Sequence, residues 1–260
     1  MRFISVLFLL AMFAAGSARA ELVHLQSRPG VTLPVLIEAP SGPAAAWVLL
    51  YVGGDGMLRL NAQGAPTSNL GQVYIVRDRR HLTAAGLGVV VVDMPSDRSS
   101  SAAPAYRLSN EHVTDIGFVV RTIRERFGRP VWIMGHSNGT FTTATAVRRL
   151  TGSERPDGAI FSSSTLIQAR KSRGLSVEPF PYNGPVLIVV HELDACDLSP
   201  PADGQNLYEL FPNARPRALR KFTGMSPTRG GVCEGNSTHS FYGLEADVMR
   251  VIAAFVRNPK

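Results

Sequence analysis

Short apolar runs alternate along this chain with longer segments in which apolar residues recur every three or four positions. The runs at 47–52, 87–92 and 185–190 consist mostly of Val, Leu and Ile, without the alternation of a half-exposed strand. Strands that are apolar on both faces are covered by other elements on both sides. Shorter strands are expected at 22–25, 31–39, 130–134, 159–161 and 219–222.

Helical spacing is clearest at 110–127, where Val113, Ile116 and Ile123 would share one face of a helix. Further helices are expected at 141–150, around 207–211 and at 244–256. Strands that alternate with helices form β-α-β crossovers, which predicts a doubly wound, mostly parallel sheet with helices on both faces, an α/β fold. Ligands of such sheets bind beyond the carboxyl ends of the strands. The irregular segments 53–71 and 93–109 are expected to flank that site as loops.

The first 20 residues have the pattern of a secretory signal peptide. Arg2 precedes an apolar stretch, and residues 18–20 form an A-x-A cleavage site. The apolar stretch is short for a membrane span. We therefore predict a signal peptide at 1–20 and a single domain at 21–260, exported to the periplasm or secreted, with no membrane span after cleavage.

Composition and charge exclude several classes of protein. With 18% charged and 45% hydrophobic residues, the chain is too apolar to be disordered. Removal of Arg2 and Arg19 with the signal peptide lowers the net charge from +7 to +5. The remaining basic residues are spread along the chain, and no zinc-finger or other nucleic-acid motif accompanies them. We therefore predict no nucleic-acid partner.

The strongest chemical signal is the pentapeptide at 135–139, Gly-His-Ser-Asn-Gly. It follows an expected strand and precedes an expected helix, which is the strand–turn–helix setting of a G-x-S-x-G nucleophile elbow. The tight turn leaves room for little but glycine at its flanking positions and lifts the serine hydroxyl above the sheet. Ser137 is therefore the candidate nucleophile; the alternative is a plain glycine-flanked turn.

A serine nucleophile needs a base, and the base needs an orienting acid. In the elbow architecture the order along the chain is Ser, acid, His, and two histidines, His191 and His239, follow Ser137. His239 lies in a polar loop before the last expected helix and is the candidate base. His191 ends an expected strand, and we interpret it as a structural residue that braces the acid loop.

The acid is expected just after the strand at 185–190. Glu192, Asp194 and Asp197 all lie there. Asp194 falls in the turn, whereas Glu192 is at the strand edge and Asp197 is past a cysteine. We rank Asp194 first, Asp197 second and Glu192 third.

Acyl transfer also needs hydrogen-bond donors for the oxyanion. One is the backbone N–H of Asn138, which follows the nucleophile. The second is expected in the glycine-rich loop at 53–56, where we choose Gly54 and Asp55 remains the alternative. The sequence contains neither of the two glycine-rich phosphate-binding motifs, so a phosphate loop is disfavoured.

The two cysteines are an even number in a chain expected to be exported, which favours a disulfide. Cys196 lies two residues after Asp194, and Cys233 lies six residues before His239. A bridge would therefore tie the acid loop to the base loop. C-x-x-C spacing is absent, so neither a redox motif nor a structural zinc site is indicated, and we predict no metal and no cofactor.

The elbow at 135–139, Asp194 and His239, in this order on alternating strands and helices, resemble the α/β-hydrolase superfamily over nearly the whole chain. The segment His-Ser-Phe-Tyr-Gly at 239–243 resembles the histidine loop of small dienelactone-hydrolase-like esterases. The resemblance implies an eight-stranded sheet with Ser137, Asp194 and His239 as the catalytic triad.

Two features depart from the lipases of that superfamily. The segment Val-Gly-Gly-Asp-Gly at 52–56 lacks the histidine of the H-G-G-G pattern. Only residues 164–184 separate the strand at 159–161 from the next strand, which is too few for a large lid domain. We therefore expect no lid domain.

The sequence as a whole predicts a serine hydrolase that cleaves an ester or similar small acyl substrate through an acyl-enzyme intermediate. Two alternatives stay open, because a fold does not fix a function. One is a non-enzymatic binding protein on the same fold; the other is a peptidase, since specificity would reside in the loops at 53–71 and 93–109. Nothing in the sequence indicates the oligomeric state.

Overall fold

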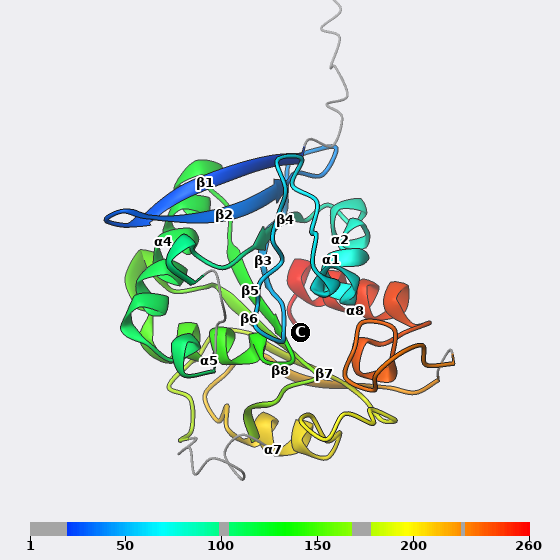
Figure 1. The fold of residues 1–260 in the computed structure, drawn as a ribbon. Coiled ribbons are helices and arrows are strands. Elements are labelled where there is room, and N and C mark those ends of the chain that lie inside the picture. Colours follow the sequence, from blue (N-terminus) through cyan, green and yellow to red (C-terminus); the bar gives the residue numbers. More distant parts are fainter. Residues whose placement is uncertain (1–19, 99–103, 168–177, 225–226) are drawn as a thin grey trace, which may run out of the picture.

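The computed structural model describes residues 20–98, 104–167, 178–224 and 227–260, so residues 1–19 of the predicted signal peptide lie outside the described residues. Eight strands form one sheet in the order β1-β2-β4-β3-β5-β6-β7-β8 (Figure 1). The strands are β1 (Ala20–Arg28), β2 (Val31–Glu38), β3 (Trp47–Tyr51), β4 (Gly88–Val92), β5 (Val131–His136), β6 (Gly158–Ser162), β7 (Val186–His191) and β8 (Arg217–Phe222).

The sheet is parallel except for β2. This strand pairs antiparallel with β1 on one side and with β4 on the other. β3 pairs in parallel with both β4 and β5, and the pairs from β5 to β8 are parallel as well. After β3 the chain adds β4 on one side of β3, and the next strand, β5, pairs with the opposite side of β3. The direction in which strands are added to the sheet therefore reverses at β3. Ligands of open α/β sheets bind at such a switch point, beyond the carboxyl ends of the strands.

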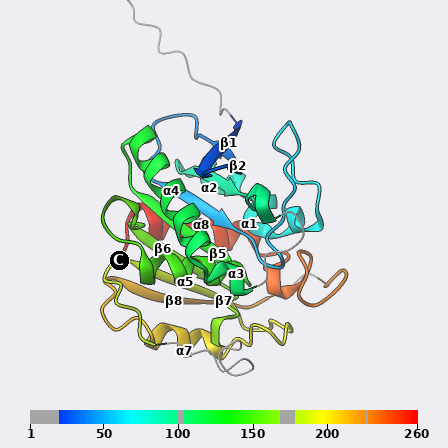
Figure 2. The same ribbon diagram turned by 60° about the vertical axis from the view of Figure 1, so that its left-hand side comes forward.

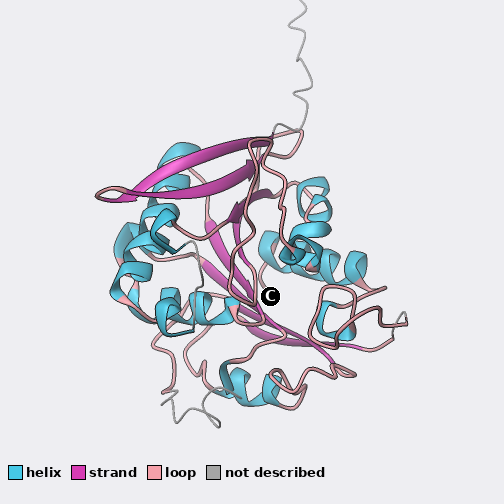
Figure 3. Ribbon diagram, in the orientation of Figure 1, coloured by secondary structure: helices cyan, strands magenta, loops and turns pink. Residues whose placement is uncertain are grey.

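Helices cover both faces of the sheet (Figures 2 and 3). One face packs against α4 (Asn110–Phe127), α5 (Gly139–Arg149) and α7 (Asp203–Glu209). The other face packs against α1 (Tyr74–Arg77), α2 (Arg80–Ala84) and α8 (Glu245–Arg257). The predicted doubly wound α/β sheet is thus confirmed.

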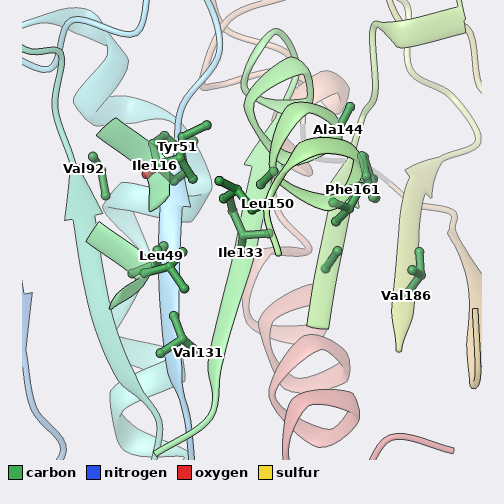
Figure 4. Packing of buried hydrophobic residues seen from close by; sticks show 14 of the residues in the cluster. Leu49, Tyr51, Val92, Ile116, Val131, Ile133, Ala144, Leu150, Phe161 and Val186 are labelled. Carbon is green, nitrogen blue, oxygen red and sulfur yellow. The ribbon is translucent and has the colours of Figure 1, made fainter. Parts of the chain in front are cut away.

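The central strands are buried on both faces, which explains their lack of hydrophobic alternation. Leu49 of β3 and Ile133 of β5 are fully buried, and they belong to one cluster with Ile116 of α4 and Ala144 of α5 (Figure 4). Burial of apolar side chains of this kind is the main stabilising contribution to a domain, about 25 cal/mol for each Å² removed from water.

The long helix α4 has the predicted ends. At its start the Ser109 hydroxyl accepts a hydrogen bond from the N–H of His112, and at its end Gly128 adopts the left-handed conformation.

The expectation of irregular loops at 53–71 and 93–109 was wrong in part. These stretches include or run into the short helices η1 (Asn69–Gln72), η2 (Ser96–Arg98) and α3 (Pro104–Arg107). Helices of three or four residues are too short to show a hydrophobic period.

The described residues contain no separate lid domain. Residues 163–185 connect β6 to β7, and 168–177 of these lie outside the described residues. No helix of the described part of the chain is long and apolar enough to cross a membrane.

Candidate active site

Ser137 lies in a tight turn between β5 and α5. Its φ is +54°, in the left-handed region that non-glycine residues rarely adopt. Side chains are excluded at both flanking glycines: a Cβ on Gly135 would overlap with the carbonyl oxygen of Gly139, and a Cβ on Gly139 would overlap with that of Tyr51. The strand–turn–helix setting predicted for the pentapeptide is confirmed.

Asp194 and His239 are paired beyond the carboxyl end of β7. His239 Nδ1 lies 2.9 Å from Asp194 Oδ2, and both side chains are buried, at 1% and 2% exposed. The second carboxylate oxygen, Oδ1, accepts a hydrogen bond of 2.9 Å from the N–H of Cys196. An imidazole held at Nδ1 in this way has a fixed orientation and a free Nε2 that can accept a proton.

Ser137 and His239 line the same cavity, whose volume is about 480 Å³. Within the described residues, His239 Nε2 makes no hydrogen bond, with the Ser137 hydroxyl or with any other group. Hydrogen bonds between catalytic groups are often long in ligand-free enzymes and tighten when substrate binds. The cavity also has polar and apolar walls from Asn69, Leu70, Gln72, Val73 and Asn236.

The acid candidates ranked second and third, Asp197 and Glu192, make no hydrogen bond or ion pair with His239 among the described residues. Glu192 is exposed and is 4.0 Å from Lys221 Nζ, and Asp197 is also exposed. His191 has the structural position that we expected. Its Nδ1 accepts the N–H of Leu193 at 3.0 Å, and its Nε2 lies 2.6 Å from the carbonyl oxygen of Gly224. His191 therefore braces the loop that carries Asp194.

The predicted disulfide is present between Cys196 and Cys233, with a Cα–Cα distance of 4.9 Å. Cys196 is buried, whereas Cys233 is exposed and lies on the cavity wall. The bridge joins the loop of Asp194 to the loop of His239, as the sequence predicted.

The loop after β3 lies directly against the candidate nucleophile. A Cβ on Gly53 would be 2.6 Å from the Cβ of Ser137, so only glycine fits there. Gly54, our choice for an oxyanion donor, follows with φ +55° and lines the cavity. Its carbonyl oxygen accepts a hydrogen bond of 3.3 Å from the Asn138 side chain. No described residue accepts a hydrogen bond from the backbone N–H of Gly54 or of Asn138.

Ser199 contacts both members of the Asp194–His239 pair, and the sequence analysis did not identify it. Its hydroxyl donates to Asp194 Oδ2 at 2.9 Å and lies 2.9 Å from His239 Nδ1. The hydroxyl oxygen can therefore accept a hydrogen bond from the Nδ1–H of His239 while its own O–H donates to the carboxylate. No local pattern marks this serine, because its partners are brought to it by folding.

His136, the residue before the candidate nucleophile, was also missed. Its ring lies 4.8 Å from the ring of His239, measured between centroids, and its Nδ1 lies 3.1 Å from the Ser162 hydroxyl. The same hydroxyl is 2.8 Å from the phenol oxygen of Tyr74. Burial, with the nearby His239 as a smaller cause, holds the pKa of His136 well below its usual value. The neutral ring forms a wall on one side of His239.

Comparison with known proteins identifies the fold. No protein-family model and no curated protein matches the sequence. Among solved structures, Est1E from Butyrivibrio proteoclasticus is 16% identical, with a TM-score of 0.60 over 92% of this chain and 98% of that chain. A dienelactone hydrolase from Anabaena variabilis is 15% identical, with a TM-score of 0.61 over 91% and 97% of the two chains. An esterase from Pyrococcus furiosus is 11% identical, with a TM-score of 0.61 over 92% of each.

These likenesses cover nearly the whole of the chains compared, and they agree with the strand order and helix layers described above. Groups of three or more residues that could hold a metal ion are absent from the described part of the chain. The eight-stranded, mostly parallel sheet, the elbow after β5 and the neighbouring structures together show that this chain has the α/β-hydrolase fold.

Proposed function

We propose that the protein is a serine hydrolase that cleaves an ester or a similar acyl substrate. The observation that carries the proposal is that His239, paired with Asp194, lines the same cavity as Ser137 at the elbow. The structural neighbours include esterases and a dienelactone hydrolase, which supports a hydrolase. They do not identify the substrate, because the identities are 16% or lower.

In the proposed mechanism, Ser137 Oγ attacks the acyl carbon while His239 Nε2 takes the hydroxyl proton. Asp194 holds the Nδ1 proton of the imidazolium that forms. His239 then gives its proton to the leaving alkoxide, and the alcohol departs. Water attacks the acyl-enzyme with His239 again as the base, so that the acid is released and Ser137 regains its proton.

The oxyanion would be bound by the N–H groups of Asn138 and Gly54. The structure supports Gly54 over Asp55 through a simple geometric argument. The C=O and N–H of a trans peptide point in opposite directions. Since the Gly54 carbonyl is turned toward the Asn138 side chain, the N–H of Asp55 points away from it.

The cavity supports a small substrate. A volume of about 480 Å³ is within the range of small-molecule sites, and no lid domain covers it among the described residues. Mixed polar and apolar walls favour a compact acyl group over a long hydrocarbon chain.

We also propose export to the periplasm or beyond, which the Cys196–Cys233 disulfide supports, because disulfides persist in oxidising compartments.

The test is labelling of the purified protein with a fluorophosphonate probe, together with hydrolysis of p-nitrophenyl esters of increasing chain length. We expect labelling and ester hydrolysis by the wild type, and neither by Ser137→Ala. Ser41→Ala is the matched control, because Ser41 is exposed and lies before β3. Activity of Ser137→Ala within a few-fold of wild type would exclude the mechanism. An unlabelled wild type would favour a binding protein, and faster cleavage of peptide anilides than of esters would favour a peptidase.

A further inference from the structure

Arg107 is a fully buried cation that forms no ion pair with a carboxylate in the described part of the chain. It ends the short helix α3, and its exposed fraction is 0%. None of the described carboxylates lies within ion-pair distance of its guanidinium, and its Nε has no hydrogen-bond partner. Burial lowers the pKa of Arg107 to about 10, with Asp55 at longer range opposing the shift, so that the side chain is still charged at neutral pH.

The guanidinium is directed at the backbone of the loop after β3. Nη2 donates to the carbonyl oxygen of Val52 at 3.0 Å and lies 3.5 Å from that of Gly53. The Gly53 carbonyl also accepts a hydrogen bond of 3.0 Å from the N–H of Gly56, on the same side of the peptide as Arg107. Nη1 donates to the Thr142 hydroxyl at 3.0 Å, in the helix that follows Ser137. One side chain therefore joins the loop of the candidate oxyanion donor to the helix that begins at the elbow.

The loop is packed onto this guanidinium. A Cβ on Gly56 would be 2.6 Å from Arg107 Nη2, and Gly56 has a φ of +81°. Gly53 and Gly54 line the cavity, whereas Arg107 does not. The loop thus has two faces, one toward the cavity and one toward the buried cation.

We propose that Arg107 is a positioning residue of the oxyanion hole, which holds and polarises the peptide groups before Gly54. The inference rests on the proposed hydrolase function. Carbonyls held toward Arg107 turn the N–H groups of the same peptides away from it, because the two bonds of a trans peptide point in opposite directions. For the peptide between Gly53 and Gly54, the group turned away is the N–H of Gly54.

Two physical reasons make such a residue useful here. A glycine-glycine peptide rotates more easily than any other, since neither residue has a Cβ that restricts φ and ψ. A cation on the carbonyl side restricts that rotation. It also strengthens the N–H on the opposite side as a donor, because hydrogen-bonded groups in a low dielectric polarise one another. Preorganised donors of this kind supply a large part of transition-state stabilisation in acyl transfer.

The test compares Arg107→Met with wild type in the hydrolysis of a short p-nitrophenyl ester. Loss of a whole oxyanion donor costs about 10²–10³ in kcat, and a residue that acts through the donor is expected to cost about 10- to 100-fold, with KM changed by less than about threefold. The rate at which a fluorophosphonate labels Ser137 is expected to fall by a similar factor. Arg107→Lys, which keeps the charge and has N–H donors on its single nitrogen, is expected to restore most of kcat.

Arg79→Met is the matched control. Arg79 is half-buried, donates to the Glu38 carboxylate through Nε and Nη2, and donates through Nη1 to the carbonyl oxygen of Val76, away from the cavity. We expect its kcat to equal that of wild type. All variants are compared at a temperature where their circular dichroism spectra coincide.

Several outcomes would overturn the inference. These are an unchanged kcat in Arg107→Met, a raised KM at constant kcat, and an equal loss in Arg79→Met. If Arg107→Met does not fold, Arg107→Gln replaces it, since the amide keeps a donor for Val52 and loses the charge; its kcat must then fall at least about fivefold, and an unchanged value contradicts the proposal. Failure of the wild type to react with the probe overturns the proposed function itself, and this inference with it.

Discussion

Asp194 has a hydrogen-bond partner on each of its oxygens. Oδ1 accepts from the backbone N–H of Cys196, and Oδ2 faces both Ser199 and His239. A buried carboxylate is stable only when its oxygens are bonded in this way. The neighbouring Asp197 is exposed, so the two aspartates of this loop differ in burial and in hydrogen bonding.

This contrast predicts different results for Asp194→Asn and Asp197→Asn. An amide at 194 presents a donor to His239 Nδ1 and disfavours the tautomer with a free Nε2, so kcat is expected to fall about 10⁴-fold. Asp197→Asn removes only a solvated charge and is expected to leave kcat within about twofold. Steady-state hydrolysis of a p-nitrophenyl ester measures both. A large loss in Asp197→Asn with little in Asp194→Asn would reverse our assignment of the acid.

At the scale of elements, the turn between β5 and α5 is the most constrained segment of the site. It passes so close to β3 that Gly139 contacts the end of that strand at Tyr51. The constraint is steric and is independent of the chemistry of Ser137. It can therefore be tested through stability alone.

We predict that Gly139→Ala destabilises the protein although alanine is the better helix former. The added Cβ would overlap with the Tyr51 carbonyl, and overpacking of this kind costs about 1–3 kcal/mol. Urea denaturation followed by circular dichroism measures the change in the free energy of unfolding. Gly42→Ala is the matched control, because a Cβ at Gly42 has no neighbour within 4 Å and is expected to leave stability unchanged. Equal stability of the two variants would show that the turn has room to relax.

The disulfide predicts a second effect at this scale. Cys196 and Cys233 are separated by 37 residues, and in the chain-entropy model their bridge stabilises the fold by about 4 kcal/mol. Reduction is expected to loosen the loops of Asp194 and His239 before the sheet unfolds, because the sheet core does not include them. Activity should therefore fall under dithiothreitol at temperatures where the far-UV circular dichroism is constant. If activity survives while thiol alkylation shows both cysteines reduced, the bridge supports stability alone.

At the scale of the whole molecule, the site forms where β3 and β5 lie side by side. The chain leaves these strands toward opposite sides of the sheet, so the loop at Gly53 and the elbow at Ser137 meet. Asp194 and His239 reach the same place from beyond β7 and from the segment before α8.

The predicted signal peptide can be tested by expressing the chain with residues 1–20 included. β1 begins at Ala20, the last residue of the predicted leader, so cleavage there removes only one described residue. We expect a chain produced with residues 1–20 in a Gram-negative host to appear in the periplasm with Glu21 at its N-terminus. Intact mass spectrometry of the periplasmic fraction measures this. A mass that retains Met1 would contradict the predicted cleavage.

Much of this architecture follows from local sequence alone. The apolar runs gave the central strands because both faces of those strands are buried, and the spacing at 110–127 predicted both ends of α4. The elbow is local too, since its two glycines and the serine lie within five residues. The candidate triad was proposed from local context in the same way, since Ser137, Asp194 and His239 each follow a recognisable strand or precede a recognisable helix; the assignment itself stays a prediction.

The tertiary structure alone decided which distant groups surround these residues. Ser199 joins His239 across 40 positions, and Arg107 reaches Val52 across 55. Neither contact leaves a periodic or motif-like signal, because it depends on where separate elements pack and not on spacing along the chain. The same holds for the orientation of the Gly53–Gly54 peptide. The glycines of this loop are readable in the sequence, but the direction of the N–H groups depends on the Gly56 N–H and Arg107 on the carbonyl side and on Ser137 packed against Gly53.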